Sequence, residues 1–162
     1  MRNNIYIGVI GQSVCEGDLY RLAYDLGCEI ARRGAILVCG GLGGVMEAAC
    51  RGAKDAGGLT VGILPGHSRE DANPFVDIAI ATGLGEARNL IIVHTASALL
   101  ACGGQAGTLS EIAFALRAGK ILAGIATWKI RDHQGREDFF PHFERPVEAV
   151  EFVFGNLRGR TP

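Results

Sequence analysis

"ILVCGGLGGVMEAA" (residues 36–49) and "LLACGGQAGTLSEIA" (residues 99–113) are two versions of one sequence pattern. Each begins with an apolar run, continues as Cys-Gly-Gly-x-x-Gly and ends in a stretch of helical character. Glycine tolerates positive φ and lets the backbone approach a ligand closely, and the N-terminus of the following helix attracts anions. The pair therefore predicts a phosphate site built on Gly40, Gly41, Gly44, Gly103, Gly104 and Gly107. Plain strand-to-helix turns without a ligand are the alternative.

On both sides of these two stretches, apolar runs alternate with helical patterns along the whole chain. The alternation predicts a Rossmann-like α/β fold: a doubly wound, mainly parallel sheet with helices on both faces, in a single domain of residues 1–162. We expect strands at 5–10, 35–39, 59–64, 77–81, 98–102 and 120–126, and helices at 17–33, 44–56, 84–95, 108–118 and 146–158. A polar loop or hairpin is expected at 129–145.

In such sheets, ligands bind beyond the carboxyl ends of the strands, where the strand order switches direction. The loops that follow the strands are therefore the expected site, and the loop after the first strand adds Gly11 and Ser13. That strand offers only Gly8-x-x-Gly11, so the dinucleotide fingerprint is missing and a dehydrogenase is disfavoured. Neither glycine loop is a Walker loop, and no Gly-x-Ser-x-Gly elbow supports a serine hydrolase.

Composition narrows the function classes further. Sixteen basic and seventeen acidic residues leave a net charge of −1, which argues against a nucleic-acid binder. The five cysteines have no C-x-x-C spacing and the four histidines have no ligand spacing, so we expect neither a metal site nor a disulfide framework. No signal peptide is evident, and the longest apolar segment, 90–102, is interrupted by His, Thr and Ser. These features predict a cytoplasmic protein that does not bind membranes.

Two charged residues near the expected site each allow two interpretations. Thr108 and Glu111 match a capping box, with Thr108 as N-cap, yet a carboxylate at that position would also lie beside a bound phosphate. Arg88 is expected in or near the first turn of a helix, where the helix dipole disfavours a cation. It can grip a phosphate in bidentate fashion, or form a surface ion pair with Glu86 or Glu70.

Three motifs together carry a family resemblance: "CGGLGGVMEAACRGAKDAGGLTVGILPG" (39–66), "GLGEARNLIIV" (83–93) and "GGQAGTLSEIAFAL" (103–116). The chain resembles the LOG-like superfamily, long mislabelled lysine decarboxylases, and within it the branch related to molybdenum cofactor carrier proteins. The resemblance implies a Rossmann-like fold and a homodimer or homotetramer. Gly107, Thr108 and Glu111 match the end of the family's Pro-Gly-Gly-x-Gly-Thr-x-x-Glu motif, and Arg88 matches its arginine.

The chain departs from the LOG enzymes in two places. Its glycine loop is one residue longer and follows Cys102 rather than proline, and Asn89 stands where those enzymes carry lysine. Two functions follow from the resemblance and the site. The first is binding of a phosphorylated ligand, a nucleotide or the molybdenum cofactor, with no other cofactor required, by the residues named above together with Asn89. The alternative is a nucleoside 5′-monophosphate phosphoribohydrolase that releases base and ribose 5-phosphate, with Glu111 and Arg88 catalytic.

Overall fold

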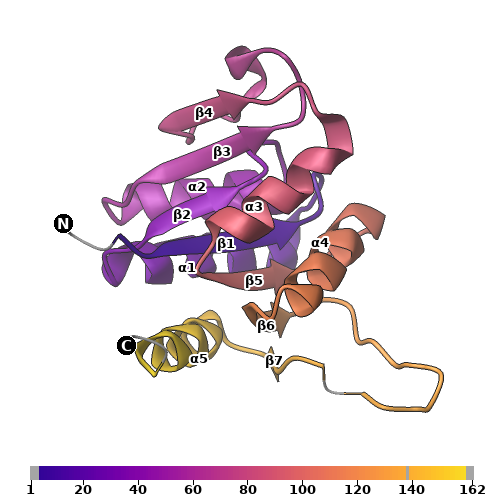
Figure 1. Ribbon diagram of the computed structural model, residues 1–162. Helices are drawn as coiled ribbons and strands as arrows, with labels where there is room; N and C mark the ends of the chain where they lie inside the picture. The colour runs from indigo at the N-terminus through magenta and orange to yellow at the C-terminus, as the bar shows by residue number, and fades with distance from the viewer. Residues whose placement is uncertain (1–3, 138, 160–162) are drawn as a thin grey trace.

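The computed structural model describes residues 4–137 and 139–159, which form one sheet and its helices. The sheet has seven parallel strands in the order β4-β3-β2-β1-β5-β6-β7 (Figure 1), which confirms the predicted fold class. The strands are β1 (Tyr6–Gly11), β2 (Ile36–Cys39), β3 (Thr60–Leu64), β4 (Ile78–Ala81), β5 (Ala98–Cys102), β6 (Ile121–Ile125) and β7 (His142–Phe143). The helices are α1 (Gly17–Arg32), α2 (Val45–Asp55), α3 (Asn89–Thr95), α4 (Ala106–Arg117) and α5 (Pro146–Arg158), with short 3₁₀ turns η1 (Arg69–Asp71) and η2 (Gly85–Arg88).

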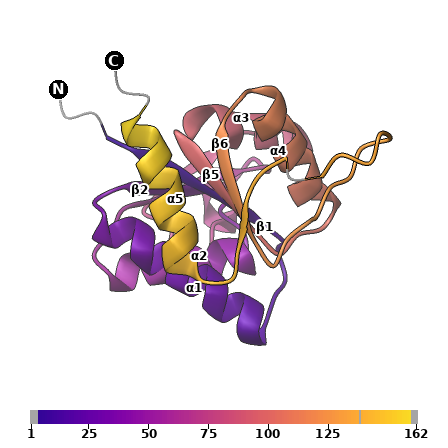
Figure 2. The ribbon, with the colours of Figure 1, turned by 90° about the horizontal axis from the view of Figure 1, so that it is seen from below.

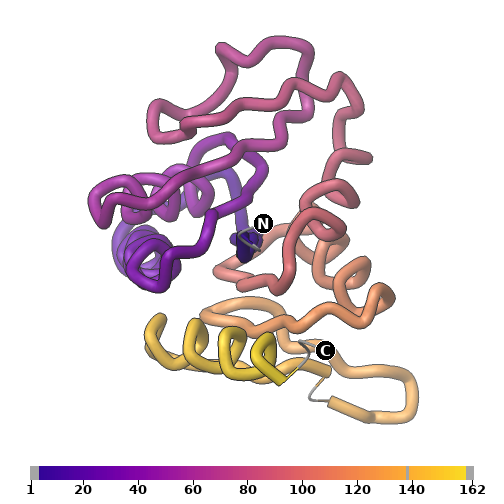
Figure 3. Tube along the Cα trace, turned by 60° about the vertical axis from the view of Figure 1, so that its left-hand side comes forward, coloured from indigo at the N-terminus to yellow at the C-terminus, as the bar shows by residue number. Residues whose placement is uncertain are grey.

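The helices form a layer on each face of the sheet. Helix α1 packs against α2 and α5, while α3 packs against α4. Figure 2 shows the first group on one side of the strands and the second on the other, and the tube in Figure 3 separates α1 and α2 from α3 and α4 in the same way. The chain adds β2, β3 and β4 on one side of β1 and then crosses to add β5, β6 and β7 on the other. The order therefore switches beside β1, which is where such sheets bind ligands.

Burial follows the apolar pattern of the sequence. Strands β3, β5 and β6 are buried along their whole length, because helices cover both faces. Helix α1 presents Ala23, Leu26 and Ile30 to the core. It also packs very closely against α2: a Cβ at Gly27 would lie 1.9 Å from the Ala49 carbonyl oxygen, so glycine at this position permits the close approach.

Two expectations about local structure need correction. The helix expected at 84–95 is divided into the 3₁₀ turn η2 and the short helix α3. Helix α4 begins at Ala106 with Gln105 as N-cap, because the extended backbone of Gln105 already places its carbonyl to accept from the Leu109 N–H. The segment expected as a polar loop or hairpin, 129–145, is a loop in its described residues, with a turn at Asp132–Gly135 and the two-residue strand β7, which pairs parallel with β6.

Candidate functional site

A cavity of about 200 Å³ lies at the carboxyl ends of β1, β2 and β5, beside the switch point of the sheet. The end of β1 and its loop form one wall, the β2–α2 loop a second, and the starts of α3 and α4 a third. The lining residues are Val9, Ile10, Gly11, Gln12, Ser13, Gly40, Leu42, Met46, Pro65, Glu86, Arg88, Asn89, Gln105, Gly107, Thr108 and Glu111. Residues from distant parts of the sequence therefore meet in one hollow.

Most of the residues expected at the site line this cavity. Those that do are Gly11, Ser13, Gly40, Arg88, Asn89, Gly107, Thr108 and Glu111. The remaining four, Gly41, Gly44, Gly103 and Gly104, lie outside its lining. The two glycine loops are at the same edge of the sheet, but the tip of β1 stands between them because β2 and β5 pair with opposite sides of β1.

Contacts within the chain explain the glycines that lie outside the cavity. A Cβ at Gly44 would lie 2.5 Å from the Gln12 carbonyl oxygen, so this glycine lets two loops cross. The Gly103 N–H donates to the Ile125 carbonyl (3.2 Å), and the Gly104 N–H donates to Oε1 of Gln12 (3.0 Å). These amides are already paired. In the first loop, the Gly41 N–H donates to the Cys39 sulfur (3.3 Å), so three of the glycine amides expected to face a ligand are bonded within the chain.

The first turn of α4 presents backbone donors to the cavity. The N–H groups of Ala106, Gly107 and Thr108 have no carbonyl four residues earlier within the helix, and the positive end of the helix dipole adds to their field. A Cβ at Gly107 would meet no atom closer than Oε2 of Glu86 at 3.8 Å, so this part of the turn is open. Asn89 donates to the Ser110 hydroxyl, which donates to the Gly107 carbonyl, and this chain of bonds fixes the turn to α3.

Arg88 is the buried cation of the site. Its side chain is only 8% exposed, which refutes the alternative of a surface ion pair. Its Nη1 donates to the Ile63 carbonyl at 2.6 Å, while Nε is buried without a hydrogen-bond partner. Gly40 makes room for the guanidinium, because a Cβ there would lie 2.1 Å from Nη1. Burial lowers the pKa of Arg88, and nearby Glu111 opposes that shift without forming a salt bridge.

Glu111 is the buried acid of the site, 7% exposed and in the second turn of α4. It does not occupy the N3 position, so the capping-box interpretation is wrong. Burial raises the pKa of Glu111 to about 8; the charge of Arg88 lowers it and that of Glu86 raises it. The carboxyl group is therefore largely protonated at neutral pH. Among the residues that the structure describes, Arg88 thus remains a buried cation that forms no salt bridge, and Glu86, which also lines the cavity, acts on Arg88 and Glu111 through its charge alone.

Sequence reasoning missed several lining residues. Gln12 stands between the expected Gly11 and Ser13, and Gln105 fills a variable position of the second glycine motif. Both could have been found by including every residue of the loops that follow β1 and β5. Met46 and Glu86 carried no such signal, since one looks like an ordinary core residue and the other like an ordinary helix start.

Within residues 4–137 and 139–159, no group of three or more His, Cys, Asp or Glu side chains is arranged to hold a metal ion. In the same residues, every helix is too short or too polar to cross a bilayer.

Comparisons with known proteins agree with this geometry. The model of the SLOG cluster4 family matches residues 4–149. An uncharacterized protein of Archaeoglobus fulgidus is 48% identical over 93% of this chain and 95% of its own. The molybdenum cofactor binding protein of Rippkaea orientalis superposes with a TM-score of 0.87 at 37% identity, covering 97% of this chain and 99% of that one. The molybdenum cofactor carrier protein of Chlamydomonas reinhardtii gives 0.81 at 35% identity, covering 98% and 100%.

Proposed function

The chain belongs to the SLOG cluster4 family, and we propose that it binds a phosphorylated small ligand in the cavity beside Arg88. The family agrees with the resemblance of its motifs to the LOG-like superfamily and its cofactor-carrier branch. The ligand is of the pterin-cofactor or nucleoside monophosphate type, and the protein holds it without converting it. The names of the Rippkaea and Chlamydomonas proteins support the cofactor-carrier form of the proposal. The phosphate itself is argued from the residues of this chain.

The guanidinium of Arg88, buried without a salt bridge and with Nε unbonded, is the observation that carries the proposal. A buried cation without an anionic partner costs free energy, and a phosphate group would remove that cost. Arg88, whose Nε has no hydrogen-bond partner, lines the same cavity as Gly107 and Thr108 of the first turn of α4. Protonated Glu111 places no negative charge in the cavity and has a hydrogen to donate. These groups together favour an anion with several acceptor oxygens.

The size of the cavity indicates how the ligand lies. Ligand sites for drug-sized molecules usually enclose roughly 300–1,000 Å³, and this cavity has about 200 Å³. It accommodates a phosphate and adjoining atoms, while the remainder of a nucleotide or a pterin cofactor would lie across its rim. The residues therefore fit the phosphate end of such a cargo.

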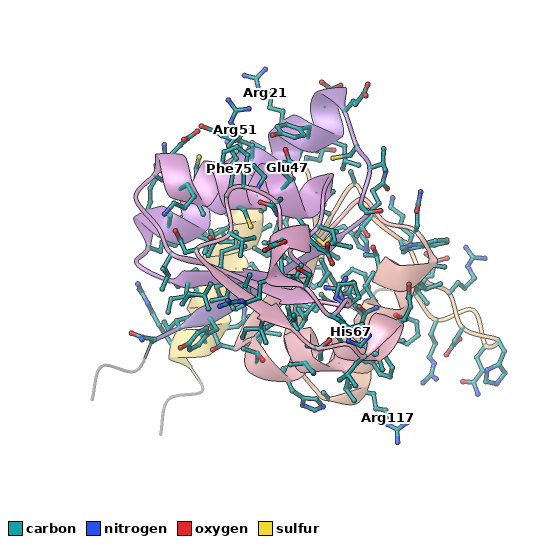
Figure 4. The ribbon with its side chains drawn as sticks, turned by 90° about the horizontal axis from the view of Figure 1, so that it is seen from above. Arg21, Glu47, Arg51, His67, Phe75 and Arg117 are labelled. Carbon is teal, nitrogen blue, oxygen red and sulfur yellow. The ribbon has the colours of Figure 1, made fainter. Side chains whose placement is uncertain are left out.

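Replacing Arg88 by glutamine tests the proposal. Isothermal calorimetry with inorganic phosphate, AMP and molybdenum cofactor released from a molybdoenzyme would measure the affinities. We expect the variant to bind these ligands about 10- to 150-fold more weakly, since a hydrogen bond to a charged group contributes about 1.5–3 kcal/mol. Arg117→Gln is the matched control, because Arg117 is exposed on the same side of the sheet and points away from the molecule (Figure 4). Equal affinities for the wild type and Arg88→Gln would refute the proposal.

A phosphoribohydrolase is the second candidate, favoured by Glu111. A carboxyl group with its pKa raised to about 8 is suited to general acid catalysis near neutral pH, and could protonate a departing base. It is less suited to stabilising a cationic ribose, which needs a carboxylate. Asn89 stands in the lining where the LOG enzymes carry lysine, which favours binding over turnover.

Incubation with AMP, GMP and CMP separates these two functions. Chromatography would detect free base and ribose 5-phosphate as products. Release of base by the wild type and its loss in Glu111→Gln would establish the hydrolase. The carrier proposal predicts that no base is released, while calorimetry still detects binding.

The homodimer or homotetramer implied by the resemblance is also a proposal. Exposed apolar side chains, among them Leu84, Leu90 and Ile91, gather on η2 and α3 in a shallow depression of the surface. Such a patch suits an interface between copies of the chain. Light scattering of the protein in solution would measure the mass, and a monomeric mass would refute it.

A further inference from the structure

The segment that follows β6 is held against the β5–α4 loop with a strained backbone at Ala126. Ala126 has a φ of 47°, and it is the one non-glycine residue with positive φ among the residues that the structure describes. Positive φ strains a side-chain-bearing residue, and such strain persists where surrounding contacts impose it. The contacts here are made by the next two residues. Thr127 donates its hydroxyl to the Gly103 carbonyl, and Nε1 of Trp128 donates to the Gln105 carbonyl at 3.3 Å.

These bonds place the indole against Gly104 and Gln105 of the β5–α4 loop; Trp128 itself is not among the residues that line the cavity. Gln105 is the N-cap of α4 and lines the cavity, so Trp128 is bonded to the residue that borders the free helix N–H groups. A Cβ at Gly104 would lie 3.2 Å from Cδ1 of Trp128, and glycine therefore leaves the space that the ring needs. Trp128 nevertheless remains 40% exposed. The bond to Gln105 uses its only polar atom, so what remains exposed is apolar ring surface.

We propose that Trp128 is a stacking platform for a planar heterocycle, and that the ligand of this site joins such a ring to its phosphate. This inference rests on the proposed function and extends it, because it names the ring as the second recognised part. The cavity has room only for the phosphate end of such a ligand, so its remainder would extend past the lining residue Gln105, to which Trp128 is bonded. Base–aromatic stacking is tolerant of ring identity, which suits a purine or a pterin alike.

Ring-free and ring-bearing probes separate stacking from phosphate binding. Ribose 5-phosphate carries the sugar and phosphate alone, whereas GMP and neopterin monophosphate add a planar ring. Calorimetry with the intact chain should show at least one ring-bearing probe binding about 5- to 150-fold more tightly than ribose 5-phosphate. Trp128 is the only tryptophan of the chain, so its fluorescence should be quenched by the ring-bearing probe and unchanged by ribose 5-phosphate.

Substitutions at Trp128 provide the second part of the test. Trp128→Leu should abolish the advantage of the ring while leaving the affinity for ribose 5-phosphate unchanged, and Trp128→Phe should retain most of that advantage. Phe139→Leu is the control, because Phe139 is 41% exposed, much like Trp128, but lies in a separate hollow lined by Pro141 and Phe152. It should bind every probe like the wild type.

Three outcomes would overturn the inference, and they are distinguishable. If ribose 5-phosphate binds as tightly as both ring-bearing probes, the platform is refuted and the phosphate site stands. If Trp128→Leu weakens binding of ribose 5-phosphate and GMP equally, the residue only holds the glycine loop in place. If none of the three probes binds, both the platform and the phosphate site are wrong.

Discussion

Replacing Glu111 by glutamine should remove a large part of the pH dependence of stability. The folded state holds the proton of Glu111 up to a pKa of about 8, whereas the ordinary value for glutamate is 4.5. Between these values the folded protein binds more protons than the unfolded chain does. The stability that this carboxyl group contributes is therefore fully present below about pH 4.5 and is lost as the pH rises towards about 8.

The magnitude follows from the burial of the group. While the folded state holds one more proton than the unfolded chain, the free energy of unfolding falls by about 1.4 kcal/mol for each pH unit. The free energy of unfolding of the wild type should therefore fall by about 3 kcal/mol, through this group, between about pH 5 and about pH 7.5. Glutamine has the shape of the protonated acid and does not titrate. The variant should show no such loss, and it should be the more stable protein above neutral pH.

Urea denaturation at a series of pH values measures this difference directly. The buffers must contain no phosphate or sulfate, because an anion bound beside Arg88 would alter both proteins. Other groups titrate as well, so the quantity to compare is the free energy of unfolding of the variant minus that of the wild type. Glu144→Gln, at an exposed position, is the control and should stay parallel to the wild type. If Glu111→Gln also stays parallel, Glu111 is not held protonated by burial and the account of the site is wrong.

Three shorter predictions follow from the same structure. Gly40→Ala would place its Cβ 2.1 Å from Nη1 of Arg88. We expect the free energy of unfolding, measured by urea denaturation, to fall by about 1–3 kcal/mol, and phosphate to bind more weakly. If the losses of stability in Gly40→Ala and Arg88→Gln simply add in the double variant, the clash is contradicted. Sulfate, whose charge is constant in this range, should bind more weakly from about pH 6.5 to about pH 9 as Glu111 ionises; calorimetry should show no such trend in Glu111→Gln, and equal trends in both would refute it. Gly155→Ala lies within α5 with no atom within 4 Å of the new Cβ, so calorimetric melting should show a gain of about 0.5–1 kcal/mol, and an unchanged or lower Tm would count against it.

Local sequence was sufficient for the architecture because each strand and helix has its own signal. Buried parallel strands are continuous apolar runs, and α1 shows its stripe at helical spacing, so the alternation alone led to a doubly wound sheet. The sequence also indicated the edge of the sheet that holds the cavity, since glycines gather in the loops after β1, β2 and β5. Gly40, Gly107, Arg88 and Glu111 were among the residues singled out.

What the sequence could not provide is which groups are already satisfied by the chain itself. The Gly104 N–H was expected to face a ligand, yet the side chain of Gln12, far away in the sequence, accepts from it. Arg88 was compatible with a surface ion pair until the fold buried it between Gly40 and Ile63. Hydrogen-bond partners and burial depend on contacts between distant segments, which no local pattern encodes. Glycine patterns thus determined where the site would lie, and only the packing of β1 between the two loops decided which of its groups remain free.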